Sequence, residues 1–330
     1  EIFSIGSTPR ILVDDVLLAR KDGVVRHIHA CTKLPEPVMV ADKPWEQEGD
    51  DKRLYIYGTV LRDAETGRFR MWYNRLRLVL LAESDDGIHW ARPELGLYNW
   101  DGSKANNIVL TDLHSPSVIY NPAADNPEYR YAMIGSAKGY RVFHSPDGLC
   151  WKPVSDEPVL VGGDTCTLAY DAKACEYLAF HKRSEEYLGQ RRRLVYLSTS
   201  RDLKAWSDPK LVMAPDKADD EQVKHEGGQY SQFYNMSAFS CGGQFLGMVT
   251  HFRYSGPTKE KGPEQSGQDV PIDVQLVHSS DGRNWSRCED RFPVIPNGPC
   301  PYDAGCILGV ANGPVIVGDE YWLYYTAITT

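Results

Sequence analysis

Acidic residues stand shortly before four stretches of the sequence that are rich in Val, Ile, Leu and Tyr. They are Glu46 in an acidic cluster at 46–51, Asp164 in "GGDTCTLAY", Glu226 in "HEGGQYSQFY" and Asp303 in "PYDAGC". Cleavage of a glycosidic bond needs one carboxylic acid to protonate the leaving oxygen and a second carboxylate as base or nucleophile. A third acid can orient the pair and tune the proton donor. We therefore predict a catalytic site from these acids, with turn capping or binding of a structural ion such as calcium as the alternative.

A second set of side chains could contact the hydroxyl groups of a bound sugar. Its members are Trp45, His114, His181, Lys182, Arg183, His251 and Asp273. Trp45 offers a flat surface for a sugar ring or packs in the core, and the charged strand ends are equally explained as solvated side chains. Asp273 alternates with apolar neighbours, which favours solvent or a hydrogen bond between blades. Ser231 and Ser237 have no Ser-His-Asp pattern around them, so serine hydrolysis is unsupported.

Four copies of one seven-residue pattern indicate a repeated architecture. Three copies read "SDDGIHW" (84–90), "SPDGLCW" (145–151) and "SSDGRNW" (279–285), and a weaker copy, "SRDLKAW" (200–206), has Leu203 in place of Gly. Asp can bond forward to the backbone of a tight turn, and Gly accepts the positive φ that the turn demands. The Trp supplies a large apolar face for packing against a neighbouring unit. Nothing in the pattern needs a ligand, so we interpret it as a structural corner.

The spacing of this pattern predicts a β-propeller. Its tryptophans are 61, 55 and 79 residues apart, and repeats of this length with β patterning are typical of four-stranded blades. Each unit reads as an inner strand, two strands that lead to the turn, and a fourth strand that starts at the Trp. The predicted inner strands are 54–60, 115–120, 165–170, 233–239 and 306–318. We predict an all-β, five-bladed β-propeller, in one domain that spans residues 1–330.

The fifth unit is incomplete at the C-terminal side, where 306–318 and 321–327 supply only two strands. A propeller must close its ring or leave an open edge. The apolar stretches 10–18 and 24–30 are candidates to finish the blade, so we expect the N-terminal strands to close it. The end of the chain inside a Tyr-rich stretch leads us to expect a longer parent protein.

Composition argues against several classes of partner. The 330 residues are 42% hydrophobic and 25% charged, with a formal net charge of −9. An acidic chain with a single dense basic run, at 191–193, disfavours nucleic acid, and no apolar run approaches the roughly 20 residues of a membrane span. The eight cysteines show no metal-binding spacing, and we expect most of them to be buried thiols; the alternative is that 166 with 175, or 300 with 306, pair in an oxidising compartment. The location stays open, with a secreted or periplasmic one favoured over the cytoplasm.

The sequence resembles the five-bladed propeller glycosidases related to glycoside hydrolase families 32, 43 and 68. The stretches "ILVDDVLL", "YGTVLRDAETGRFRMWY", "PIDVQLVHSSDGRNW" and "GCILGVANGPVIVGDEYWLYYTA" look like bacterial proteins with a family-32-like N-terminal domain. The resemblance covers nearly the whole chain. It implies the propeller fold strongly and the substrate only weakly.

The resemblance also implies roles for single residues. Asp164 matches the orienting Asp of the arabinanase type, and Glu226 matches the proton-donor Glu by order and spacing. The sequence departs from the family pattern at the first acid, and Gln232 stands where a Glu would suit an acid. We predict a hydrolase of a neutral oligosaccharide or glycoside at an acid-lined axial pocket. The alternatives are a non-catalytic carbohydrate-binding propeller and a glycoside phosphorylase, for which Lys182 and Arg183 could bind phosphate.

Overall fold

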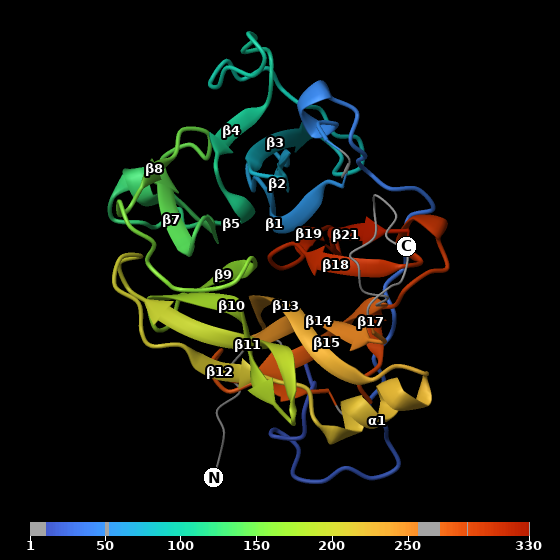
Figure 1. Ribbon diagram of the computed structural model, residues 1–330. Coiled ribbons are helices and arrows are strands. Elements are labelled where there is room, and N and C mark those ends of the chain that lie inside the picture. The colour runs from blue at the N-terminus through green and yellow to red at the C-terminus, as the bar shows by residue number, and fades with distance from the viewer. Residues whose placement is uncertain (1–10, 50–52, 257–270, 289, 330) are drawn as a thin grey trace.

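The computed structural model describes residues 11–49, 53–256, 271–288 and 290–329. Within this part the chain is mostly β-structure, with one α-helix and three short 3-10 helices. Figure 1 shows its sheets arranged around a common centre. In the described part, no helix has the length and apolar character needed to cross a membrane.

The first three sheets have four antiparallel strands each, in chain order from the centre outward. The first contains β1 (Tyr55–Arg62), β2 (Phe69–Arg75), β3 (Leu78–Ser84) and β4 (Ile108–Thr111). The second contains β5 (His114–Tyr120), β6 (Tyr131–Ser136), β7 (Tyr140–Ser145) and β8 (Lys152–Pro153). The third contains β9 (Cys166–Asp171), β10 (Glu176–Tyr187), β11 (Gln190–Ser200) and β12 (Lys210–Met213).

The remaining strands form a larger sheet and a separate hairpin. The sheet holds β13 (Tyr230–Cys241), β14 (Gln244–Tyr254), β15 (Ile272–Ser279), β16 (Ser286–Arg287) and β17 (Pro293–Ile295). One parallel pair then joins β15 to β18 (Cys306–Val310), which pairs with β21 (Tyr325–Ile328). The hairpin is β19 (Val315–Val317) with β20 (Glu320–Trp322). The helices are α1 (Lys217–His225), η1 (Pro44–Glu46), η2 (Pro127–Tyr129) and η3 (Pro301–Asp303).

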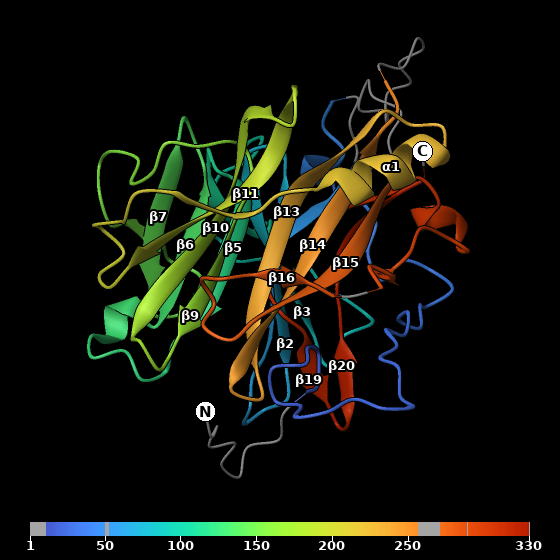
Figure 2. The same cartoon turned by 90° about the horizontal axis from the view of Figure 1, so that it is seen from below.

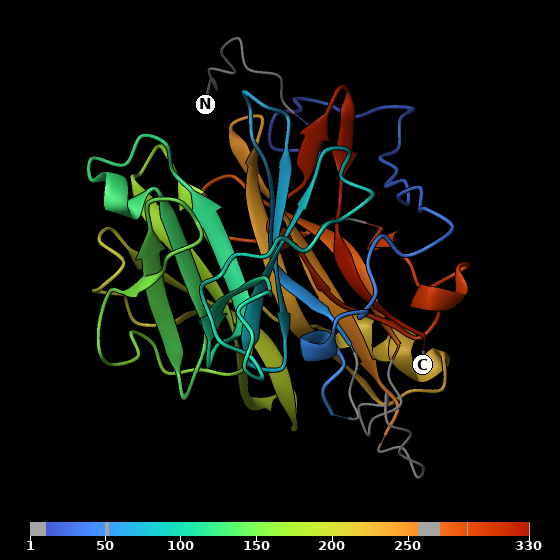
Figure 3. The same cartoon turned by 90° about the horizontal axis from the view of Figure 1, so that it is seen from above.

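The five predicted inner strands are confirmed as strands at the centre of the molecule. Each inner strand contacts the next one in the order β1, β5, β9, β13 and β18, and β18 in turn contacts β1. Figures 2 and 3, each turned by 90° from Figure 1, show the strands lengthwise and the sheets side by side. Because β18 and β21 share a sheet with β13–β15, the sheets themselves do not fix the number of blades.

The core lies between neighbouring sheets. One buried cluster joins Trp72 and Leu81 of the first sheet to Met133 of the second. Another joins Phe180 of the third sheet to Phe233 of the fourth. Burying a large apolar side chain contributes about 1.5–3 kcal/mol, so these inter-sheet layers hold the sheets to one another.

The four repeated turns share one geometry, as predicted. In the first, the Ser84 hydroxyl accepts from the Gly87 N–H at 2.8 Å, and Asp86 Oδ1 accepts from the next two backbone N–H groups at 2.8 Å. The other three copies repeat these bonds at 2.7–2.9 Å. The turn residue has φ of 75° at Gly87, and Leu203 in the weaker copy adopts 66°. The weaker copy therefore accepts the left-handed backbone with a side chain present.

The expected fourth strands begin at the predicted place in only part of the repeats. Two-residue strands β8 and β16 directly follow Trp151 and Trp285. After Trp90 there is only an isolated bridge between Glu83 and Ala91, and β4 comes about twenty residues later.

The N-terminal segment does not supply the strands expected of 10–18 and 24–30. From residue 11 to 49 the described chain contains no strand, and residue 10 lies outside the described residues. Asp15 forms an ion pair with Arg26 at 2.6 Å, and Arg26 Nε donates to the Leu12 carbonyl at 2.6 Å. These contacts join residues within the same segment, which is a loop and not part of a sheet. The prediction that N-terminal strands close the last blade is wrong for the described residues.

Candidate active site at the centre of the sheets

Asp164 lies at the centre of the molecule, two residues before β9 begins. Its side chain is 48% exposed, and one carboxylate oxygen forms an ion pair with Lys182 Nζ from β10. The Tyr234 hydroxyl, from β13, donates to the other carboxylate oxygen at 3.2 Å. The Lys182 ammonium also lies 4.0 Å from the centre of the Tyr234 ring. The acid is therefore both accessible and held in a fixed orientation.

Two further side chains from the inner strands complete this group. The Tyr57 hydroxyl lies 3.3 Å from the Tyr234 hydroxyl. The His114 ring packs edge-on against Tyr57, with ring centres 5.6 Å apart. We call Tyr57, His114, Asp164, Lys182 and Tyr234 the axial cluster. Its members come from β1, β5, the start of β9, β10 and β13.

Hydrogen bonds from side-chain hydroxyls to backbone carbonyls of the neighbouring unit position the axial cluster. The Ser115 hydroxyl donates to the Asp164 carbonyl, and Thr165 Oγ1 donates to the Tyr234 carbonyl at 3.3 Å. Ser115 has φ of 48°, at a register shift in the pairing of β5 with β6. The hydroxyl of Ser115, at this irregularity, thus links the start of β5 to the residue two positions before β9.

The electrostatics of the cluster favour an ionised Asp164. Burial would raise the pKa of Asp164, but the Lys182 ammonium outweighs it and holds that pKa below its ordinary value. Burial lowers the pKa of Lys182 although Asp164 acts in the opposite direction. An ion pair alone would lower the pKa of the acid and raise that of the lysine, but burial keeps the pKa of Lys182 below its ordinary value. Because each charge stabilises the other, both groups are ionised.

The other polar groups of the cluster are neutral donors or acceptors. Burial, with the nearby charge of Asp164, raises the pKa of Tyr234 and of Tyr57 well above the ordinary tyrosine value. Burial lowers the pKa of His114. Both phenols therefore keep their protons at neutral pH, and His114 is uncharged there.

Glu226 lies apart from the axial cluster, at the C-terminal end of α1. Its side chain is 39% exposed, and Arg253 Nη1 donates to it at 3.0 Å. Arg253 Nη2 also pairs with Asp273 at 3.2 Å. The structure thus joins Glu226 to Asp273 through one arginine. Within the described residues, no hydrogen bond or ion pair connects Glu226 to the axial cluster.

Glu46 and Asp303 are buried acids with internal partners. Glu46 is fully buried, accepts from the Tyr73 hydroxyl at 2.5 Å, and pairs with Arg92 at 3.1 Å. Asp303 is also fully buried and pairs with Lys33 at 2.5 Å. A sugar cannot reach either carboxylate in this conformation. The four predicted acids therefore do not meet in one acid-lined pocket; residues 50–52 of the first acidic cluster lie outside the described residues.

Three predicted binding residues also have structural roles. Trp45 donates through Nε1 to Asn107 at 2.8 Å and packs against the core cluster of the first sheet. His181 is buried, and burial lowers its pKa to about 4. Arg183 is partly exposed and lies over the Tyr196 ring at 5.2 Å, on the third sheet.

A Ser-His-Asp group that the sequence did not reveal lies inside the fourth sheet. The Ser231 hydroxyl lies 2.9 Å from His251 Nε2, and His251 Nδ1 lies 3.7 Å from Asp273. The Gln275 amide nitrogen is closer to His251 Nδ1, at 3.0 Å. Because that amide donates to Nδ1, His251 carries its proton on Nε2 and cannot take one from Ser231. Ser231 and His251 are also completely buried, so this group is a structural hydrogen-bond network.

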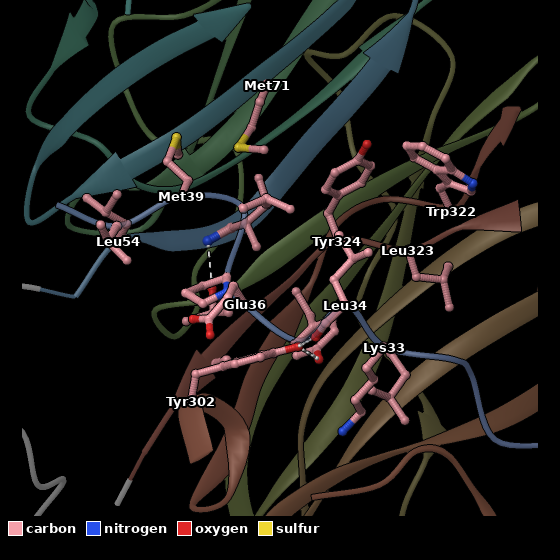
Figure 4. Close-up of a pocket in the computed structure, with 18 of the residues that line it drawn as sticks. Lys33, Leu34, Glu36, Met39, Leu54, Met71, Tyr302, Trp322, Leu323 and Tyr324 are labelled. Carbon is pink, nitrogen blue, oxygen red and sulfur yellow. Dashed lines mark hydrogen bonds between the residues drawn. The ribbon is translucent and has the colours of Figure 1, made fainter. Parts of the chain in front are cut away.

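A cavity of about 820 Å³ lies away from Asp164, between the first sheet, β21 and the segment 31–41. Figure 4 shows its largely apolar wall. Residues of that wall include Met39, Leu54, Met71, Tyr302, Trp322 and Tyr324. Tyr55 also lines it and stacks on Tyr57 with ring centres 5.7 Å apart. The cavity therefore borders the axial cluster without containing its charged groups.

Sequence reasoning missed Tyr57 and Tyr234 of the axial cluster. Tyrosines near the beginnings of predicted inner strands were the available signal for both. All eight cysteines are free thiols, so neither of the two alternative disulfide pairings forms. No group of three or more His, Cys, Asp or Glu side chains within the described ranges could hold a metal ion.

No family model and no curated protein matches the chain. Solved structures do resemble it. An N-acetylgalactosamine deacetylase from F. plautii, in complex with blood group B trisaccharide, has a TM-score of 0.56 and 18% identity, over 88% of this chain and 84% of that one. A glycosyl hydrolase from Bacteroides ovatus has a TM-score of 0.57 and 11% identity, over 92% and 91%. A third structure belongs to work on the GH130 family of mannoside phosphorylases, a family described as containing glycoside hydrolases that target β-1,2 mannosidic linkages in Candida mannan. It has a TM-score of 0.55 and 12% identity, over 94% of each chain.

Likeness at 11–18% identity establishes the fold alone. The chain has the fold of the propeller-type glycoside hydrolases and phosphorylases. The resemblance to propeller glycosidases predicted from the sequence is thereby confirmed.

Proposed function

We propose that this protein is an enzyme that cleaves a glycosidic bond, with Asp164 at the reaction centre. The observation that carries the proposal is the position of Asp164. It is the one predicted acid, among those described, that lies at the centre of the sheets with a half-exposed side chain. The propeller fold shared with carbohydrate-active enzymes supports the same proposal.

Asp164 acts in the proposal as a carboxylate, since its lowered pKa leaves it without a proton to donate. It serves as base toward an attacking water or as nucleophile toward the sugar. The Tyr234 hydroxyl and the Lys182 ammonium orient it. Glu226 is the proposed proton donor on the sequence match alone, since in this structure it lies apart from the axial cluster and pairs with Arg253. A carboxylate separation of about 5 Å in the complex implies retention, and about 6.5–9.5 Å implies inversion.

Phosphorolysis is a second candidate, because Lys182 places a cation beside the exposed acid. In that reaction phosphate replaces water as the group that attacks the sugar. The proposal also keeps a single five-bladed propeller over 1–330. Its support is the ring of contacts among the five inner strands.

The test is turnover of a panel of oligosaccharides and activated glycosides, with and without phosphate. Replacing a true general acid or base costs roughly 10²–10⁴ in rate, so we expect that loss in Asp164→Asn and in Glu226→Gln. Glu128→Gln, which changes a 45%-exposed surface acid paired with Lys152, is the matched control and should turn over normally. Binding without turnover across the panel would favour a carbohydrate-binding protein. Unchanged turnover in Glu226→Gln would remove that residue from the mechanism.

A further inference from the structure

Arg193 places a second cation next to the axial cluster. Its guanidinium lies 5.8 Å from the centre of the Tyr234 ring and 4.7 Å from that of Phe252. Its backbone N–H and its Nη1 both donate to Gln232 Oε1 at 3.0 Å. Gln232 is a buried, uncharged amide. The guanidinium is therefore fixed in place by a partner that leaves its charge uncompensated.

The register of the β10–β11 hairpin brings the two cations to the same face. Lys182 pairs with Val195, and Ser184 pairs with Arg193. Side chains at i and i+2 of a strand share one face, so Lys182 and Arg193 are diagonal neighbours across the ladder. Burial and the like charge of Arg193 both lower the pKa of Lys182, against the effect of Asp164. The two cations therefore lie close enough for the charge of Arg193 to lower the pKa of Lys182.

The charges on this face do not cancel within the described part of the chain. Lys182 has Asp164 as its counter-ion. Arg193 forms no ion pair with a described carboxylate, and its side-chain partners are Gln232, Tyr234 and Phe252. Arg193 is only partly buried. A fixed, partly exposed guanidinium with free donors matches the planar geometry of a carboxylate, sulfate or phosphate.

We propose that Arg193 and Lys182 form an oxyanion subsite beside Asp164, so that the substrate of the proposed reaction carries or is accompanied by an oxyanion. This inference rests on the proposed function for the location of the sugar. It replaces the expected preference for neutral substrates, whose basis was the net charge of −9 together with an acid-lined axis. The oxyanion comes from a carboxylate or sulfate on the sugar, or from inorganic phosphate.

Calorimetric binding distinguishes these sources. The probes are pairs of glycosides that differ only in a carboxylate against a hydroxymethyl group, glucuronide against glucoside and galacturonide against galactoside. Sulfated and unsulfated pairs and orthophosphate alone complete the set. The variants are Arg193→Met, Arg193→Lys and Gln232→Glu, which places a carboxylate where Arg193 now meets an amide. Arg201→Met is the matched control, since Arg201 directly follows the far end of β11 and pairs with Glu176.

We expect the anionic member of at least one pair, or orthophosphate, to bind the wild type. A hydrogen bond to a charged group corresponds to roughly 10- to 100-fold in affinity, so Arg193→Met and Gln232→Glu should each lose about that factor. The neutral member should bind all variants alike, Arg193→Lys should keep part of the preference, and Arg201→Met should keep all of it. Orthophosphate binding that depends on Arg193, with phosphate-dependent turnover, would identify phosphate as the oxyanion.

Two results would overturn the inference. One is equal affinity of the wild type for both members of every pair together with no orthophosphate binding. The other is an anion preference that survives in Arg193→Met and Gln232→Glu. Anion binding that depends on Arg193 without any turnover would leave the subsite standing and would remove the proposed bond cleavage instead.

Discussion

Replacing Lys182 by Met should raise the pKa of Asp164 above the ordinary aspartate value. In the wild type the ammonium overcomes the burial of Asp164 and lowers that pKa. An opposite charge this close typically lowers a carboxyl pKa by about 1–3 units. The variant removes that charge while the burial remains, so the pKa of Asp164 should rise past that of a free aspartate.

Carbon-13 NMR of the aspartate carboxyl groups measures this shift without knowledge of the substrate. The Asp164 resonance is the one that Asp164→Asn lacks. Once a substrate is known, the acid limb of kcat/KM against pH should move upward by the same amount, because activity requires the ionised carboxylate. Lys182→Arg retains the charge and should titrate nearly as the wild type does. Lys152→Met, which breaks a surface pair with a 65%-exposed lysine, should leave Asp164 unchanged.

An Asp164 resonance that titrates at the same pH in wild type and in folded Lys182→Met would refute this reasoning. A shift of equal size in Lys182→Arg would also refute it, because the cause would then be packing around the longer head group and not charge. Circular dichroism across the titration confirms that each variant stays folded in the range used.

Three other substitutions test structural assignments, each followed by urea unfolding. Gly148→Ala places a methyl group at a residue with φ of 76°, 2.8 Å from a buried indole carbon, so the free energy of unfolding should fall by about 1–3 kcal/mol. The control is Gly102→Ala, at φ of 82° with nothing within 4 Å, which should lose less. Equal losses would exclude the indole contact as a cause. Glu46→Gln leaves Arg92 without its buried counter-ion and should cost about 3–5 kcal/mol, whereas a normal midpoint would show that the network relaxes. Ser231→Ala should cost about 1 kcal/mol and leave turnover unchanged; lost turnover with normal stability would make the buried serine functional.

The inner strands and turns were predictable because their signals are local. Each turn carries its own Ser, Asp and positive-φ residue within seven positions, and the bonds form among those residues. Each inner strand is an apolar run next to such a unit. Nothing comparable marks α1, whose residues are mostly polar and whose Asp220 pairs with Arg192, 28 positions earlier, at 2.6 Å. The helix is fixed by distant arginines that no local pattern identifies.

The candidate site was predictable only in part, for the same reason. Glu46, Asp164 and Asp303 all stand shortly before inner strands, yet only Asp164 is exposed. All three acids have a cationic partner. Arg92, 46 positions from Glu46, and Lys33, 270 positions from Asp303, form pairs in which the acid is fully buried, whereas Asp164 stays 48% exposed beside Lys182. Position before a strand predicts where an acid lies, and long-range pairing decides whether a substrate can reach it.

The repeated turn and the candidate site lie at opposite ends of the sheets. In the first sheet Ser84, which opens the turn, stands opposite Phe69, and Phe69 stands opposite Arg62 at the end of β1. Tyr55 lies at the other end of β1, next to the axial cluster. The end with four copies of one hydrogen-bonded turn is fixed alike in the four units that carry the turn. The opposite end has no such repeat, because Tyr57, His114 and Asp164 stand at or near the starts of the first three inner strands. There the fold can change its chemistry without loss of the corners that stabilise it.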